Sequence, residues 1–193
     1  MFLIKMTLYL FFKKFDMKKQ LLTTVAIICI SLISVNINAQ DFKDLDKSPM
    51  DAASFPSSNS VTQKLVKVIY SRPQLRGRTV ESLTPFGKVW RTGANEATEI
   101  TFHKDVTFGG KPVKTGTYSL FTIPGDKEWA FIISSDVDVW GAYSYDEAHD
   151  VARTVVPVKE GKENLEAFSI AFDSEGTMHL GWGTVRVAVP IKE

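Results

Sequence analysis

The sequence predicts an all-β fold, an antiparallel β-sandwich preceded by a signal peptide. Three observations support this fold class. β-Branched and aromatic residues alternate with polar ones in short runs, turn sequences separate these runs at regular spacing, and no long helical pattern occurs. We expect about eight strands in a jelly-roll or immunoglobulin-like arrangement, because strand spacing alone does not distinguish these two topologies.

The expected strands follow one another from residue 61 onward. They are the runs VTQKLVKVIY, ATEITFH, GTYSLFTI, EWAFIIS, DVARTVVPV, AFSIAFD and TVRVAVPI. In the second run, Ile100 and Phe102 face one way, whereas Thr101 and His103 face the other. This alternation is typical of a strand that is buried on one side.

Turn sequences lie between these runs. Gly109-Gly110 is a two-residue hairpin signal, Pro124-Gly125-Asp126 is a tight turn, and residues 173–176 (DSEG) form a longer hairpin loop. Residues 145–150 (YDEAHD) are the one plausible helical turn, and this turn is too short to change the fold class.

The N-terminal residues 1–39 have the pattern of a signal peptide. From Met17, a possible true start, two lysines precede an apolar run of 15 residues at 21–35, and Ala39 precedes the predicted cut before Gln40. A membrane-spanning helix needs roughly 20 apolar residues, so we favour cleavage over the rival interpretation, an uncleaved anchor. We therefore expect an exported protein, periplasmic or extracellular, without stable membrane insertion after cleavage.

The single cysteine, Cys29, lies within this apolar run behind two isoleucines, whereas lipid attachment requires a small residue before the cysteine. Lipidation is thus not expected. After cleavage no cysteine remains, which excludes disulfides, thiolate metal sites and cysteine nucleophiles. Residues 40–60 are polar and read as a flexible lead-in, and residues 61–193 read as one β-sandwich domain.

The expected mature chain is slightly acidic. Residues 40–193 contain 18 Lys and Arg against 21 Asp and Glu, a net charge of −3. This balance provides no basic field for nucleic acid or for anionic lipid, so neither is an expected partner.

A polar and aromatic loop precedes the second strand run. It holds Trp90, Arg91, Asn95 and Glu96 around Gly93. A guanidinium, an amide, a carboxylate and a ring could together bind a sugar, a peptide end or a small acid. In the alternative interpretation, Trp90 packs in the core and Arg91 pairs with Glu96 across the turn; for Trp90 alone we favour the core.

This region resembles a known family. The runs GKVWRTGANEATEI and GTYSLFTIPGDKEW, with WGAYSY further on, resemble the signature of small exported bacterial proteins catalogued as domain of unknown function 2911. The resemblance extends from about Val61 to near the C-terminus. It implies an exported, β-rich domain whose biochemical role is not established.

Two further groups could bind a ligand. In WGAYSYD (residues 140–146), a strand would place Tyr143 and Tyr145 on one face as a stacking platform, although such rings also fill cores. In SRPQLRGR (residues 71–78), the residue before proline is held extended, which fixes the direction of Arg72. For Arg76 and Arg78 a solvated turn is the favoured interpretation.

Catalytic patterns are weak. The separations of His103, His149 and His179 match no short metal-ligand motif, so no metal site is predicted. No nucleophile elbow occurs. Glycoside cleavage needs two carboxyl groups, and Glu96 could pair with any of several aspartates, namely Asp136, Asp138 or Asp146.

These observations leave three functions open. We favour an exported domain, without an assigned catalytic role or cofactor, that binds a small polar or carbohydrate-like ligand or a partner protein through residues 91–96. The alternatives are an exported hydrolase that uses Glu96 or a histidine-bound metal, and a structural or stress-related domain with no ligand site. The predicted ligand-binding residues are Arg91, Asn95, Glu96, Arg72, Tyr143 and Tyr145.

Overall fold

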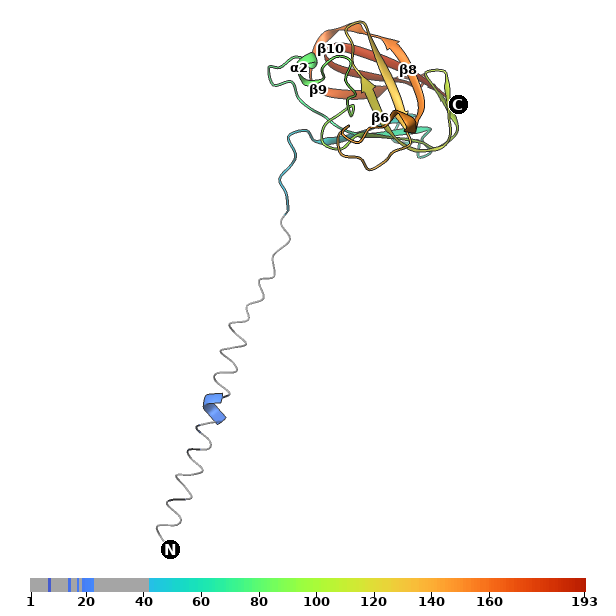
Figure 1. The fold of residues 1–193 in the computed structure, drawn as a ribbon. Helices are drawn as coiled ribbons and strands as arrows, with labels where there is room; N and C mark the ends of the chain where they lie inside the picture. Colours follow the sequence, from blue (N-terminus) through green and yellow to red (C-terminus); the bar gives the residue numbers. More distant parts are fainter. Residues whose placement is uncertain (1–6, 8–13, 15–16, 18, 23–41) are drawn as a thin grey trace. The chain divides into compact units, whose positions relative to one another are not determined.

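The computed structural model describes residues 7, 14, 17, 19–22 and 42–193. It divides the chain into two units, Met1–Asp44 and Leu45–Glu193 (Figure 1). In the first unit the described residues from 7 to 22 are helical, and most of the predicted signal peptide lies outside the described residues. Among the residues that are described, no helix has the length and apolar character needed to cross a membrane.

The second unit is all-β. Its described residues form ten strands: β1 Met50–Phe55, β2 Val66–Ser71, β3 Thr98–Phe102, β4 Val106–Phe108, β5 Lys111–Val113, β6 Gly116–Ile123, β7 Glu128–Ser134, β8 Asp150–Pro157, β9 Lys159–Phe172 and β10 Thr177–Lys192. Two short helices, α2 (Val80–Leu83) and the 3₁₀ turn η1 (Glu147–His149), lie between strands. The expected helical turn at residues 145–150 is confirmed by η1.

The strands form two antiparallel sheets that pack as a sandwich, as the sequence predicts. One sheet has the order β1-β2-β3-β6-β7-β8 and the other has the order β5-β4-β10-β9. In Figure 1, β6 and β8 belong to the first sheet, whereas β9 and β10 belong to the second. Short turns connect β4 to β5 at Gly109-Gly110, β6 to β7, and β9 to β10.

The core lies between the two sheets. Ile100 and Phe102 of β3 are almost fully buried there, which confirms the predicted alternation. Large aromatic residues fill much of this space: Trp129, Trp182, Phe102, Phe108, Phe131 and Phe168. Because each such side chain removes a large apolar area from water, this layer supplies most of the stability of the domain.

The sheet begins earlier than the sequence predicts. Residues 40–60 were expected to be a flexible lead-in, but Met50–Phe55 form strand β1, which pairs antiparallel with β2 from Met50↔Ser71 to Phe55↔Val66. The expectation of a lead-in is therefore wrong for this segment. MDAASF contains small and polar residues and lies at the sheet edge, so it lacks the strong apolar alternation that marks the other strands.

Candidate functional site

Two loops cover the outer face of the six-stranded sheet. Phe121 and Ile132 face each other on β6 and β7, and they alternate with Leu120 and Ile133, which belong to the core between the sheets. Phe121 and Ile132 therefore lie on the opposite face. The loops at residues 84–97 and 135–149 cover them and form a second, smaller apolar cluster, to which they contribute Val89, Ala97, Val139, Ala142 and Tyr145.

Backbone hydrogen bonds join these two loops. The Ala97 N–H donates to the Val139 carbonyl at 2.9 Å, and the Gly141 N–H donates to the Asn95 carbonyl at 3.0 Å. Glu96 and Trp140 form a β-bridge between these contacts. The polar segment around residues 91–96 and the aromatic segment around Trp140 are thus neighbours, although 44 positions separate Glu96 from Trp140 in the sequence.

The first loop has an unusual backbone. Thr92 and Asn95 have φ values of 55° and 62°, in the left-handed region that non-glycine residues seldom adopt. Thr92 is buried and held by its neighbours: its carbonyl accepts from the Thr98 hydroxyl at 2.7 Å, and its own hydroxyl donates to Thr122 at 3.1 Å. The conformation of this loop is therefore fixed by contacts with the sheet beneath it.

Arg91 lacks a partner at this junction. Its Nε is buried and has no hydrogen-bond partner. Within residues 42–193, no carboxylate forms an ion pair with its guanidinium, so the Arg91–Glu96 pair of the alternative interpretation does not form. A charged group withdrawn from water without a counter-ion is unfavourable.

A small pocket lies against this guanidinium. It has a volume of about 220 Å³ and is lined by Val89, Trp90, Arg91, Ala142 and Tyr143. Tyr143 is 84% exposed, so its ring stands at the mouth of the pocket. Gly141 lies behind both side chains with φ +72°, and a Cβ at this position would come within 2.7 Å of the Tyr143 ring. The glycine thus permits the close approach of Arg91 and Tyr143.

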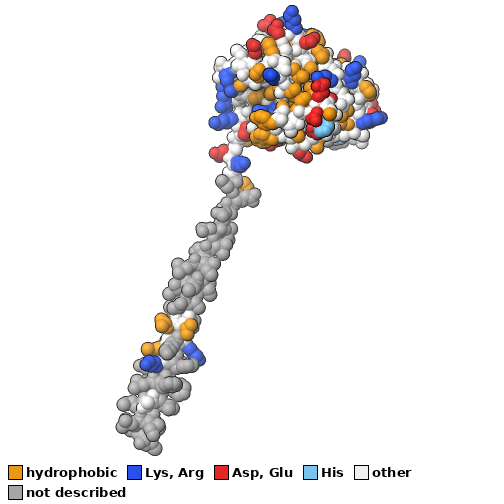
Figure 2. Space-filling model, in the orientation of Figure 1, with side chains coloured by type: hydrophobic (Ala, Val, Ile, Leu, Met, Phe, Trp, Pro, Cys, Tyr) orange, Lys and Arg blue, Asp and Glu red, His pale blue; other side chains and the backbone are white. Residues whose placement is uncertain are grey.

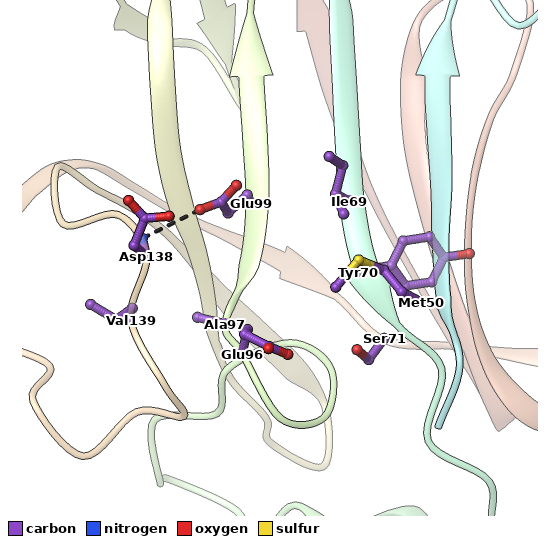
Figure 3. A pocket seen from close by; sticks show the side chains of 9 residues that line it. All are labelled: Met50, Ile69, Tyr70, Ser71, Glu96, Ala97, Glu99, Asp138 and Val139. Carbon is purple, nitrogen blue, oxygen red and sulfur yellow. Dashed lines mark hydrogen bonds between the residues drawn. The ribbon is translucent and has the colours of Figure 1, made fainter. Parts of the chain in front are cut away.

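Glu96 lines a second pocket, of about 340 Å³ (Figure 3). Glu99 and Asp138 line the same space, and the Asp138 N–H donates to Glu99 Oε1 at 3.3 Å. Arg91 lines the first pocket and Glu96 the second, whereas Asn95 lines neither of them. The structure therefore places the predicted guanidinium and carboxylate on one loop but in two different pockets.

The WGAYSY segment is not a strand. Residues 141–144 form a turn, so the expected common face of Tyr143 and Tyr145 does not exist. Tyr145 instead packs against Phe121 at a ring distance of 5.3 Å, and its hydroxyl donates to Asp150 and accepts from Arg153 at 2.8 Å. Burial, together with the hydrogen bond to Asp150, raises the pKa of Tyr145 to about 12. Tyr145 thus anchors the loop, and only Tyr143 lines the Arg91 pocket.

Arg72 connects the two sheets. Its Nε donates to the Phe168 carbonyl at 3.0 Å, Nη1 to Asp51 at 3.1 Å and Nη2 to the Ser169 hydroxyl at 2.8 Å. These contacts link the end of β2 to β1 and β9, and Arg72 lines neither of the two pockets. The Arg72 side chain is thus held by protein partners.

Trp90 packs against the core, which is the interpretation that we favoured for this residue from the sequence. Its ring stacks on Trp182 at 5.6 Å and contacts Phe168 edge-on at 5.1 Å. The indole N–H donates to the Gly93 carbonyl at 3.1 Å. One side of Trp90 thereby closes the core, while another forms the apolar wall of the Arg91 pocket.

The three histidines occupy separate places. His149 Nδ1 lies 2.9 Å from Asp136, His179 Nε2 lies 2.9 Å from Asp173, and His103 is exposed beside Lys104. Hydrogen bonding to His179 lowers the pKa of Asp173 to about 2. In the described part of the chain, no three His, Cys, Asp or Glu side chains are grouped to hold a metal ion.

Of the residues that line the second pocket, only Glu96 was a predicted ligand-binding residue, and the polar residues Glu99 and Ser71 were not singled out. Glu99 lies within a strand run, where the alternation that buries Ile100 places residue 99 on the outer face. Its carboxylate is an uncommon choice for a central strand, and this was the signal available in the sequence. Ser71 ends β2 and is buried, and no sequence pattern marked it.

The comparisons with known proteins identify a family. No curated protein and no solved structure shows significant similarity to the chain. A family model described as "Protein of unknown function (DUF2911)" matches residues 48–191, about three quarters of the sequence. The match begins two residues before β1 and includes both loops of the candidate site. The chain therefore belongs to the DUF2911 family.

Proposed function

We propose that this protein is an exported binding domain whose ligand is a small carboxylic acid, held in the Arg91 pocket. The observation that carries this proposal is the half-buried guanidinium of Arg91, which has a covered Nε without a partner and no counter-ion among the described residues. The proposal narrows the small polar ligand expected from the sequence to one that bears a negative charge.

Electrostatics support an anion at this place. Arginine stays protonated at all physiological pH values, so Arg91 cannot relieve the cost of burial by losing its proton. A carboxylate would supply both the missing counter-charge and hydrogen-bond acceptors for the terminal nitrogens. We place the carboxylate in the pocket that Arg91 lines, against its guanidinium.

The walls restrict the rest of the ligand. Val89, Trp90 and Ala142 are apolar, and the Tyr143 ring stands at the mouth. The volume of about 220 Å³ lies below the 300–1,000 Å³ typical of drug-sized ligand pockets. These features favour a short acid with an apolar or ring-shaped body over a long polymer. Figure 2 shows acidic and basic side chains interspersed on the visible face of the domain. Because this face has no large area of one charge, we expect the charge of Arg91 itself to recognise the acid.

Export is part of the proposal. It rests on the lysines, the apolar run and Ala39 at the N-terminus of the sequence. We expect the protein recovered outside the bacterial cytoplasm to begin at Gln40, and N-terminal sequencing measures this directly. A chain that keeps residues 17–39 in the membrane fraction would contradict cleavage and favour the anchor.

Calorimetric titration with short carboxylic acids tests ligand binding. Phenylacetate and butyrate are the probes, and the uncharged phenylacetamide and butyramide are their controls. We expect the acids to bind and the amides to bind at least about tenfold more weakly, because the amides lack the charge that pairs with Arg91. Arg91→Gln should abolish the difference between acid and amide.

A matched variant separates this pocket from general charge effects. Arg76→Gln removes an exposed guanidinium from another loop and should bind phenylacetate as the unaltered protein does. Arg91→Ala should likewise abolish binding but leave a cooperative thermal transition. Collapse of that transition would show that the loop is only structural, and the ligand assignment would then be withdrawn.

A further inference from the structure

A third pocket lies away from the loop junction and is lined by the end of β8, the start of β9 and two parts of β10. Its volume is about 370 Å³. Its basic residues are Lys159, His179 and Arg186, and the other lining residues are apolar: Pro157, Leu180, Val187 and Ala188. None of the residues that line it is acidic. The pocket therefore combines positive charge with an apolar wall.

Two of these basic residues face each other. Lys159 and Arg186 are directly opposite on the antiparallel strands β9 and β10. Side chains at such positions lie on the same face of a sheet, and like charges placed there destabilise it. Within residues 42–193, neither residue forms an ion pair with a carboxylate. An anion between these two facing cations would remove their repulsion.

Backbone carbonyls hold the guanidinium of Arg186 in place. Nη1 donates to the Gly183 carbonyl at 2.9 Å and to the Val185 carbonyl at 2.8 Å, and Nη2 donates to the Glu163 carbonyl at 2.7 Å. All three acceptors are uncharged, so they orient the guanidinium without neutralising it. No hydrogen bond within residues 42–193 uses Nε, which leaves this donor for a ligand.

Two glycines make room for this side chain. A Cβ at Gly161 of β9 would lie 2.6 Å from Cζ of Arg186, and a Cβ at Gly181 of β10 would lie 3.3 Å from its Cδ. The side chain of Arg186 therefore lies over the backbone of both strands. The register of β10 with β9 also shifts twice between Gly181 and Val185, and irregularities of this kind redirect side chains. The local backbone thus places the guanidinium beside Lys159.

The carboxylate of Asp173 does not balance the facing cations. His179 Nε2 lies 2.9 Å from Asp173, which also accepts from the N–H groups of Glu175 and Thr177 at 2.9 Å. The hydrogen bond from His179, together with these backbone bonds, lowers the pKa of Asp173 to about 2. Asp173 does not line the pocket. Its charge therefore stabilises the turn between β9 and β10.

We propose that the facing cations bind the phosphate group of a small molecule. The phosphate oxygens would accept from Lys159 Nζ and from Arg186 Nε. A phosphate monoester carries nearly two negative charges at neutral pH and three acceptor oxygens, which suits two cations better than a single carboxylate does. A phosphate group alone would fill only a small part of the pocket. The apolar wall, with Pro157 and Ala188, would receive the organic part of the ligand.

This inference does not depend on the carboxylic acid proposed for the Arg91 pocket. The two pockets share no lining residue. The Arg91 pocket holds one cation, whereas the third pocket has two that face each other. Either proposal can therefore fail while the other stands.

Titration with phenyl phosphate tests the inference, in a buffer free of phosphate and sulfate. Calorimetry measures the affinity, and the ³¹P resonance reports on the phosphate group itself. Phenol is the uncharged control, and we expect it to bind at least about tenfold more weakly. Inorganic phosphate is the second probe. Weaker binding of inorganic phosphate would assign the apolar wall to an ester, and equal binding would assign the site to free phosphate; both results support the facing cations. Absence of saturable binding by either phosphate compound would overturn the proposal.

Variants of β9 locate the phosphate. Lys159→Gln should weaken phenyl phosphate binding about tenfold, and this exposed side chain has no contact that folding requires. Gly161→Ala should also weaken it, because the methyl group displaces the guanidinium of Arg186 from its carbonyls. Lys162→Gln makes the same charge change on an exposed residue of the same strand and should bind unchanged. Equal losses in Lys159→Gln and Lys162→Gln would show a general charge effect and overturn the assignment.

A crossed comparison separates the two pockets. Arg91→Gln should bind phenyl phosphate as the unaltered protein does, and Lys159→Gln should bind phenylacetate as the unaltered protein does. Loss of phenyl phosphate binding in Arg91→Gln, with full binding in Lys159→Gln, would place the phosphate in the Arg91 pocket and overturn this inference.

Discussion

The guanidinium of Arg91 lies directly against Gly141, with Nη1 only 3.0 Å from the position that a Cβ at residue 141 would occupy. The same missing Cβ lets the Tyr143 ring approach the turn. The first loop supplies the guanidinium and the second supplies the glycine, and the Gly141–Asn95 backbone bond holds them together. The Arg91 pocket thus depends on a residue that carries no side chain.

Gly141→Ala should impair the pocket. Alanine at φ +72° is strained by about 1–2 kcal/mol, and its methyl group would displace Tyr143 and Arg91. Gly87→Ala is the control, because Gly87 has the same φ of +72° but nothing within 4 Å of its added Cβ. Urea unfolding should show similar losses for both variants, whereas only Gly141→Ala should weaken phenylacetate binding. Equal binding by the two variants would contradict the role of Gly141.

The fold class was predictable because burial in a two-layer sandwich has a period of two. Val66 and Val68 alternate with exposed or half-buried neighbours, and so do Ile100 and Phe102. Strand β1 escaped prediction because its side chains are small or only half-buried and do not alternate between apolar and polar, although it pairs with β2 along its full length. An edge strand of this kind leaves a weak pattern in the sequence.

The site was predictable only in part. The polar loop was evident from Arg91, Asn95 and Glu96, but their division between two pockets was not. Left-handed backbone at Thr92 and Asn95 turns the chain between Arg91 and Glu96, and threonine gives no sign of such a conformation in the sequence. The contact with Trp140 is likewise tertiary, since it depends on how both loops cover Phe121.

Trp90 and Trp140 should differ strongly in their effect on stability. Trp90 stacks on Trp182 and packs against the core, so Trp90→Ala should lower the free energy of unfolding by about 3–5 kcal/mol. Trp140 is 59% exposed, and Trp140→Ala should change the free energy of unfolding by no more than about 0.5 kcal/mol. Thermal or urea unfolding of both variants checks this. Comparable losses would show that Trp140 packs more closely than the structure indicates.

Arg72→Met should destabilise the domain without changing ligand binding. Methionine keeps an apolar stem but loses the hydrogen bonds to Asp51, Phe168 and Ser169, which we expect to cost about 2 kcal/mol in urea unfolding. Arg76→Met is the control and should stay within about 0.5 kcal/mol, because that side chain is exposed. A loss of phenylacetate binding in Arg72→Met, with stability retained, would return Arg72 to the ligand site.

The pair of His149 and Asp136 should make the second loop pH-dependent. The hydrogen bond to Asp136, together with its charge, raises the pKa of His149 above 6.5. The Ser135 N–H also donates to the His149 carbonyl at 3.0 Å. The contact between His149 and Asp136 therefore lies at the base of the loop at residues 135–149, where its two ends meet. The folded state binds this proton more tightly than the unfolded state, so its stabilising effect is complete below pH 6.5 and is lost as the pH rises through the raised value.

Asp136→Asn tests this directly. Removing the carboxylate should move the pKa of His149 back toward 6.5 and eliminate the pH dependence of the protection factor of the Ser135 amide, its exchange rate relative to that of an unprotected amide, in that window. Asp126→Asn, in the β6–β7 turn, is the control and should leave the pKa of His149 and the protection of the Ser135 amide unchanged. Two-dimensional NMR titration of the imidazole resonances measures the pKa, and protection factors of the Ser135 amide above and below that pKa measure loop closure. If the pKa of His149 stays raised in Asp136→Asn, another group supports its charge and Asp136 does not close the loop.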